Sequence, residues 1–226
     1  MGNFILDGNT YAAIAGSGRT ISNANGQVDL YLFQINTTST NNGTVLSLPP
    51  LVLGTSDPVP FAYGTTGSSV VIIGYGGGMG ESWGINTITE INTSITPEGY
   101  SYVSNDFITL TGVTTYNNPN GPGSESITNN AQLVSGDSGG GDFIYNAATE
   151  QWELVVINEV TGTDNYGQDF SGFVQLDTYA AQINAIFNPP QATTDTPTMP
   201  FPWLIVMGCL LVWVASRSFI GKATGS

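Results

Sequence analysis

Residues 135–160 read SGDSGGGDFIYNAATEQWELVVINEV, and this stretch decides the fold class. Two apolar runs, residues 142–145 and 152–160, have the length and the β-branched and aromatic content of strands. The glycines ahead of them are typical of a loop. We therefore expect two neighbouring strands that follow a glycine-rich loop.

The chain before this stretch repeats the pattern of short apolar runs and polar loops. Further strands are predicted at residues 28–35, 69–75 and 106–110. Residues 116–130 have almost no apolar content, which predicts an exposed loop. The sequence shows no repeat of fixed period.

One helix is predicted in this part of the chain, at residues 177–187. Asp177 is suited to the N-cap, and an apolar face is formed by Tyr179, Ile183, Ile186 and Phe187. Short strands, long loops and one terminal helix are typical of an antiparallel barrel or sandwich. The predicted fold class is therefore all-β.

Acidic residues dominate the charge of the chain. It has 17 Asp and Glu against 3 Lys and Arg, for a formal net charge of −14 at pH 7. A surface this negative repels phosphate backbones, so nucleic acid is excluded as a partner. Cys209 is the only cysteine and histidine is absent, which excludes an intrachain disulfide and a zinc site built on these residues. We expect neither a metal nor another cofactor.

The C-terminal part has a different composition. Residues 189–200, PPQATTDTPTMP, have the proline and threonine content of an extended linker. Residues 201–222 begin with an uncharged apolar run and close with Arg217 and Lys222, so they are predicted to form a membrane helix with a basic cytoplasmic end. The arrangement resembles bacterial sorting signals, and it predicts a cell-surface or extracellular location for residues 1–188. The alternative is a helix buried in the protein core.

The pentapeptide Gly136–Gly140, GDSGG, carries the chemistry. It sets the hydroxyl of Ser138 among backbone amides that can hold a developing negative charge. A polar loop precedes it, and the two strands of residues 142–160 and the helix of residues 177–187 follow it.

This order of features resembles the C-terminal half of the chymotrypsin/trypsin-like serine protease family. Residues 70–76, VVIIGYG, and residues 28–32, VDLYL, are similar to two earlier segments of that family. The resemblance implies a double antiparallel β-barrel with one C-terminal helix, in which the N-terminal barrel is incomplete. It also implies a serine endopeptidase acting on a protein or peptide substrate.

Carried onto this sequence, the resemblance makes Ser138 the nucleophile and Asp29 the carboxylate that orients the base. Gly136 and Ser138 would supply the amides of the oxyanion hole. Asp137 is similar to the residue that receives a new N-terminal amine on activation in the family.

The resemblance also implies where the substrate binds. Gln132 corresponds to the floor of the specificity pocket, and Asn158, Glu159 and Val160 correspond to its wall, which favours an uncharged substrate side chain. Gly141 stands where the family has proline, and the cysteines that brace this loop in the family are absent here.

The base is missing, because the sequence contains no histidine. One explanation is truncation: the N-terminus has no signal peptide, and only 28 residues precede Asp29, so a histidine and the first strands would lie before Met1. A second is a catalytically inactive pseudoprotease that acts as a cell-surface binding module. A third is an unrelated all-β adhesin in which GDSGG is a coincidence.

Overall fold

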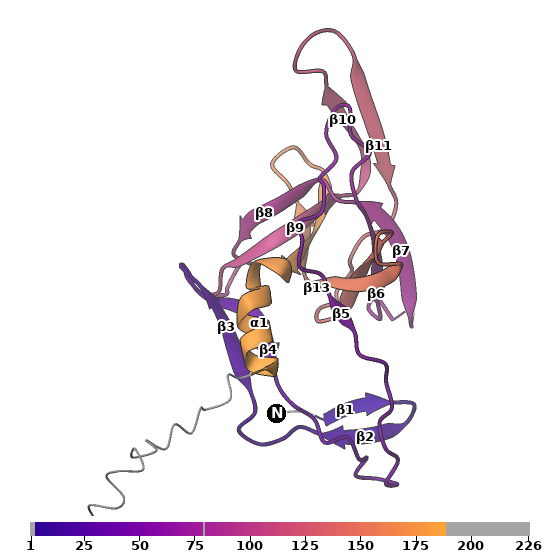
Figure 1. The fold of residues 1–226 in the computed structure, drawn as a ribbon. Helices are drawn as coiled ribbons and strands as arrows, with labels where there is room; N and C mark the ends of the chain where they lie inside the picture. The colour runs from indigo at the N-terminus through magenta and orange to yellow at the C-terminus, as the bar shows by residue number, and fades with distance from the viewer. Residues whose placement is uncertain (1–2, 79, 189–226) are drawn as a thin grey trace, which may run out of the picture. The chain divides into compact units, whose positions relative to one another are not determined.

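The computed structural model describes residues 3–78 and 80–188, and these residues form β-sheet with one short helix (Figure 1). The all-β class is therefore confirmed. The strands are β1 Asn3–Leu6, β2 Asn9–Ala12, β3 Arg19–Asn23, β4 Gly26–Leu32, β5 Val52–Leu53, β6 Ser69–Gly74, β7 Ser82–Thr87, β8 Glu90–Ile95, β9 Ser104–Leu110, β10 Gly112–Asn117, β11 Ser124–Asn129, β12 Gly141–Asn146, β13 Gln151–Thr163 and β14 Asp169–Gln175.

The main sheet has the strand order β7-β6-β12-β13-β14-β9-β8, and β5 pairs in parallel with β13 beside it. Its two outer strands, β7 and β8, are consecutive in the chain. Between them, the amide of Ile88 donates to Ser68 O at 3.0 Å beside β6, and the amide of Thr89 donates to Ile108 O of β9 at 2.8 Å. The chain therefore crosses directly from one edge of the sheet to the other and closes it into a barrel.

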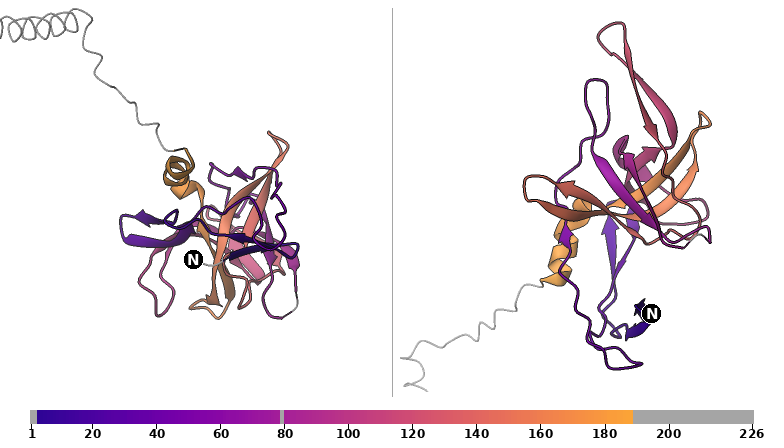
Figure 2. Two further views of the ribbon diagram at one scale, coloured as in Figure 1. Left: turned by 90° about the horizontal axis from the view of Figure 1, so that it is seen from below. Right: turned by 90° about the vertical axis from the view of Figure 1, so that its right-hand side faces the viewer.

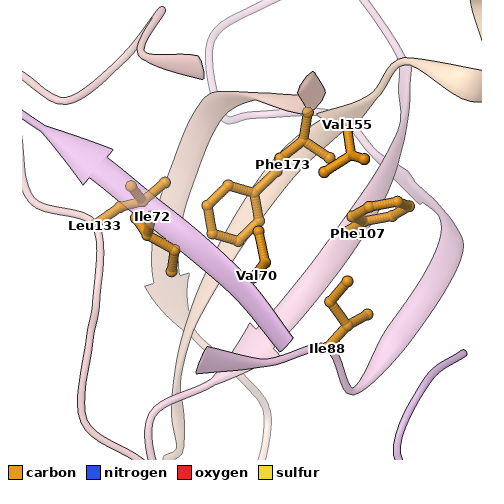
Figure 3. Packing of buried hydrophobic residues seen from close by; sticks show 8 residues of the cluster. Val70, Ile72, Ile88, Phe107, Leu133, Val155 and Phe173 are labelled. Carbon is orange, nitrogen blue, oxygen red and sulfur yellow. The ribbon is translucent and has the colours of Figure 1, made fainter. Parts of the chain in front are cut away.

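The interior of this barrel is apolar because alternate residues of its strands point inward. Figure 3 shows the side chains of Val70, Ile72, Ile88, Phe107, Leu133, Val155 and Phe173 packed together. Phe107 and Phe173 are 1% and 0% exposed. Burial of each such side chain contributes about 1.5–3 kcal/mol. Leu133 lies in this core only five residues before Ser138, so the core fixes the start of the serine loop.

A second apolar cluster joins the N-terminal ribbon β3–β4 to the end of the chain. Ile21 and Val28 of this ribbon are buried against Val174 of β14 and against Tyr179 and Ile183. Figures 1 and 2 show helix α1, Ala180–Phe187, lying alongside this ribbon. The cluster fixes the face of β4 opposite to Asp29, because neighbouring residues of a strand point to opposite faces.

The N-terminal strands do not form a second closed sheet within the described residues. β1 pairs only with β2, and β3 only with β4, as two separate antiparallel ribbons.

The helix prediction was partly wrong. A 3₁₀ turn, Asp177–Tyr179, precedes α1, and Asp177 makes no capping hydrogen bond with its side chain. Tyr179 and Ile183 are buried as expected, but Phe187 is 64% exposed. The turn is wound by backbone bonds such as Tyr179 N to Leu176 O at 3.0 Å, so no side-chain cap is needed to start the helix.

The exposed loop predicted at residues 116–130 was also wrong. Most of it belongs to the β10–β11 hairpin, which extends away from the main sheet (Figures 1 and 2). Its six paired positions run from Gly112–Asn129 to Asn117–Ser124. The hairpin is held by backbone pairing and by polar contacts such as Thr115 Oγ1 to Ser126 Oγ at 2.8 Å, so it has no apolar pattern that the sequence could display.

The linker predicted at residues 189–200 and the membrane helix predicted at residues 201–222 lie outside the described residues. Within residues 3–78 and 80–188, no helix combines the length and the apolar character needed to cross a bilayer.

Candidate active site

The serine loop lies between β11 and β12 and is folded around the carboxylate of Asp137. This side chain is 6% exposed. Its Oδ1 accepts a hydrogen bond from the amide of Gly76 at 2.6 Å, and its Oδ2 accepts one from the amide of Val134 at 2.8 Å. The Asp137 carboxylate therefore connects the serine loop by a hydrogen bond to the segment that follows β6.

Glycines after β6 are required by this close approach. A Cβ at Gly76 would lie 2.7 Å from Ser135 O and 2.8 Å from Asp137 Oδ1, and a Cβ at Gly74 would collide with the same carboxylate. Residues 74–76, Gly-Tyr-Gly, thus have a steric function: they let the serine loop pack against β6.

Asn158 of β13 holds the other side of the loop. Its side chain is 2% exposed, and its Nδ2 donates to Ile73 O at 2.9 Å and to Asp137 O at 3.1 Å. The amide of Gly139 donates to Asn158 O at 2.9 Å. Asn158 therefore holds the serine loop by hydrogen bonds and links it to β6 and β13.

Ser138 is exposed at the tip of this loop. Among the described residues, neither its amide nor that of Gly136 has a hydrogen-bond acceptor, although the amides of Asp137, Gly139 and Gly140 are all paired. Gly136 has φ +102°, a conformation that favours glycine. Two amides without an acceptor among the described residues and one exposed hydroxyl on the same loop are the groups that an oxyanion hole and a serine nucleophile require.

Two pockets meet at Ser138. One, of about 370 Å³, is lined by Ser138 together with Asp29, Tyr100, Tyr102, Glu159 and Val160. The other, of about 400 Å³, is lined by Ser138, Gly136 and Tyr75 on the opposite side. The structure therefore brings Asp29 and Ser138 to one pocket although 109 positions separate them in the chain.

Asp29 reaches this pocket from β4. Its side chain is exposed, and its amide donates to Ser104 Oγ at 3.3 Å. Burial raises the pKa of the Tyr102 hydroxyl, and the charge of the nearby Asp29 carboxylate raises this pKa further. The hydroxyl of Tyr102 thus stays protonated in the pocket.

Two further carboxyl groups lie behind the pocket. Asp106 of β9 is 0% exposed, and burial together with the neighbouring Glu159 raises its pKa to about 10. Burial also raises the pKa of Glu159, and the hydrogen bond from Ser104 Oγ to Glu159 Oε1 at 2.9 Å opposes that increase. Both carboxylate oxygens of Asp106 are buried without a hydrogen-bond partner among the described residues.

Of the four expected substrate-binding residues, two line the pocket and two do not. Glu159 and Val160 line the pocket with Ser138, whereas Asn158 is buried beneath the loop. Gln132 is half-buried and outside this lining, and its Nε2 donates to Thr161 Oγ1 at 3.3 Å. Thr161 lines the pocket, so Gln132 contacts a pocket residue without lining the pocket itself.

Several residues in and around the pocket were not predicted from the sequence, among them Tyr102, Ser104 and Asp106. The one available signal is Asp106, a carboxylate that starts the apolar run DFITL in a strand with buried residues on both faces. Within the described ranges, no group of three Asp, Glu, His or Cys side chains is arranged to hold a metal ion.

Comparison with known proteins does not assign the chain to a family. No family model matches the chain, and no curated protein matches it. Among solved structures, the chain is similar to an HtrA-type protease with a decapeptide, at 15% sequence identity and a TM-score of 0.33. The match covers 76% of this chain and 44% of the length of that chain.

Proposed function

We propose that this protein has a trypsin-like fold and is a serine endopeptidase that acts by acyl transfer through Ser138. The observation that carries the proposal is the exposed Ser138 hydroxyl between two amides without acceptors, in a pocket that also holds Asp29. Asp137 and Asn158 fix this loop from both sides, so the amides are held before a substrate binds.

In the proposed reaction, Ser138 Oγ bonds to the carbonyl carbon of a peptide while its proton passes to a base. The amides of Gly136 and Ser138 stabilise the oxyanion, each by about 3 kcal/mol in the transition state. The C–N bond then breaks, the amine leaves with the proton, and water hydrolyses the acyl-enzyme. Asp29 would orient the base, which is not a histidine of this sequence, because it has none. Gln132, Asn158, Glu159 and Val160 would form or support the substrate pocket.

The second candidate function is that of a catalytically inactive pseudoprotease acting as a cell-surface binding module. One observation favours it: the sequence contains no histidine that could serve as the base. The pocket and the supported loop would then serve binding alone.

For the C-terminal part, we propose that residues 189–200 form a linker and that residues 201–222 anchor the protein in a membrane. Residues 1–188 would then face the outside of the cell. The apolar composition of residues 201–215 and the basic Arg217 and Lys222 support this proposal.

Labelling with a fluorophosphonate probe tests the enzymatic function. The purified chain alone should neither cleave casein nor react rapidly with the probe, because loss of a triad member typically costs about four powers of ten in rate. Imidazole added to the solution would supply the missing base if it enters the pocket that Asp29 and Ser138 line. We expect it to increase labelling of Ser138 at least tenfold.

The control variants are Ser138→Ala, which should abolish labelling, and Ser94→Ala, which removes an exposed hydroxyl of β8 outside the lining of both pockets and should leave labelling unchanged. If imidazole produces no labelling that depends on Ser138, the pseudoprotease is the better description. Rapid labelling without imidazole would mean that the chain contains its own base.

A further inference from the structure

The two pockets that meet at the proposed nucleophile both combine carboxylates with exposed tyrosines. In the first pocket, of about 370 Å³, Asp29 and Glu159 line the wall beside Tyr100. In the second, of about 400 Å³, Glu81 lines the wall beside Tyr75. Each side of the serine therefore offers an acidic group and an aromatic ring to whatever enters the pocket.

No basic side chain among the described residues balances these carboxylates. Arg19 is the only Lys or Arg in that part of the chain, and it lines neither pocket. Its guanidinium donates to Gly16 O and Gly18 O at 2.9 and 2.7 Å. Both pockets therefore have a negative potential, which attracts cations to the serine.

The wall of the first pocket contains carboxyl oxygens that no described residue satisfies. Glu159 Oε1 accepts the hydrogen bond from Ser104, but Glu159 Oε2 is buried without a partner. Asp106 lies beside Glu159, is 0% exposed, and has no partner for either carboxylate oxygen. Burial of such oxygens without a partner costs free energy and raises the pKa of Glu159. A cation in the pocket would supply the opposite charge and lower this pKa again.

The tyrosines indicate which kind of cation fits. Tyr75 and Tyr100 are 74% and 61% exposed, and the ring of Tyr100 lies 5.0 Å from that of Tyr102, measured between centroids. An ammonium or guanidinium group is attracted to the face of such a ring as well as to a carboxylate. A metal ion is the less suitable cation, because no group of three acidic side chains in the described ranges is arranged to hold one. The chemistry of both pockets therefore suits a Lys or Arg side chain.

We propose that the two pockets select a basic peptide, with one Lys or Arg side chain on each side of the bond that Ser138 attacks. Asp29 and Glu159 face the cation on one side, and Glu81 faces the cation on the other. The proposal rests on the proposed function and names its substrate class.

This substrate class differs from the uncharged side chain that the sequence favours. That expectation placed Gln132 at the floor of the pocket, whereas Gln132 lies outside the lining. The acidic Glu159 lines the pocket in its place, and Glu81 lines the other pocket. The charge of the site is therefore decided by residues that the comparison with the family did not single out as acidic contacts.

Calorimetric titration of the full chain with two blocked hexapeptides tests the preference without any need for activity. The probes are acetyl-Ala-Ala-Lys-Lys-Ala-Ala-amide and its neutral counterpart with Gln in place of both Lys. In 0.01 M sodium chloride, the lysine peptide should bind at least about tenfold more tightly, because each cation meets a carboxylate and an aromatic ring. The ratio should fall in 0.15 M salt, which screens these charges. Equal affinity for the two peptides in 0.01 M salt overturns the proposal.

Charge-removing variants separate the pockets from the net charge of the molecule. Glu159→Gln keeps an oxygen that can accept the Ser104 hydrogen bond, and Glu81→Gln changes an exposed side chain, so both variants should fold. Each should weaken binding of the lysine peptide at least about threefold. The matched control is Glu150→Gln, which removes the same charge at an exposed position outside both pockets and should leave the affinity unchanged. Equal weakening by all three variants would mean that the net charge alone attracts the peptide, and would overturn the proposal.

Imidazole-assisted labelling of Ser138 keeps this proposal distinct from the proposed function. Labelling that depends on Ser138, together with equal binding of the two peptides, leaves the enzymatic function intact and overturns the basic substrate. Absence of labelling overturns the enzymatic function. A preference for the lysine peptide that depends on Glu81 and Glu159 would then still establish the two pockets as a binding site for basic peptides.

Discussion

At the scale of single residues, Asp137 explains why the serine loop has its shape. Its two carboxylate oxygens accept hydrogen bonds from Gly76 and Val134, which lie on different segments of the chain. The sequence resemblance suggested that Asp137 receives a terminal amine. The structure shows this carboxylate turned inward with both oxygens engaged by backbone amides, so its observed contribution is to fold the loop.

Asp137→Asn should destabilise the protein by about 2 kcal/mol, because the new amide NH₂ group would face a backbone N–H and leave it without an acceptor. The free energy of unfolding is measured by urea denaturation. Glu98→Gln, at an exposed loop position, is the matched control and should change this free energy by no more than about 0.5 kcal/mol. Equal effects of the two substitutions would show that Asp137 does not hold the loop.

At the scale of elements, β6 and β12 are joined by a buried carboxyl group directly after the serine loop. Asp142 is 0% exposed, and its Oδ1 accepts a hydrogen bond from the amide of Ile73 at 2.9 Å. Burial raises the pKa of Asp142 to about 8, the hydrogen bond from Ile73 opposes this increase, and the charge of Asp137 adds to it. We therefore expect the contribution of Asp142 to the free energy of unfolding to depend on pH.

Because the pKa of Asp142 is higher in the folded than in the unfolded protein, the folded state binds more protons between pH 4 and 8. The stability that this group contributes is present below its unfolded pKa and is lost as pH rises through about 8. Asp142→Asn cannot lose a proton, so the difference in unfolding free energy between this variant and the wild type should grow in favour of the variant by up to about 1.4 kcal/mol per pH unit.

Urea denaturation of both proteins at pH 4, 6 and 8 measures this difference. A difference that is constant over the range, or that grows in favour of the wild type, would mean that Asp142 is ionised in the folded protein.

The elements also show what the sequence could and could not predict. β6, β9, β12 and β13 were predicted because their apolar runs are packed in the barrel, and burial requires such runs. The β10–β11 hairpin was missed because its stability depends on backbone pairing and polar side chains. Ser138 and Asp29 were predicted from local motifs, whereas the hydrogen bond between Ser104 and Glu159 joins separate strands and has no local signal.

At the scale of the whole molecule, acidic residues far outnumber basic residues. The formal net charge is −14, and Arg19, the one basic residue among those described, donates to backbone carbonyls. Repulsion among the acidic groups therefore reduces the stability of the folded state. Salt screens such repulsion over a Debye length that falls from about 30 Å at 0.01 M to about 8 Å at 0.15 M.

We expect the melting temperature to rise as sodium chloride increases from 0.01 to 0.15 M and to change less above that concentration. Calorimetry at pH 7 measures it, with sucrose solutions as a control for effects that do not depend on charge. A melting temperature that falls over the same range would indicate that favourable ion pairs outweigh the repulsion.

The central claim is that the loop of residues 136–140 holds two amides ready around the Ser138 hydroxyl. A crystal structure of the protein with a peptide boronic acid tests it most directly, because boron can bond to a serine oxygen and display the geometry of the tetrahedral intermediate. The account predicts a bond from boron to Ser138 Oγ, with one boronate oxygen about 2.7–3.1 Å from the amide nitrogens of Gly136 and Ser138. A boronate bound elsewhere, or bound to Ser138 with both amides turned away from it, would contradict the account.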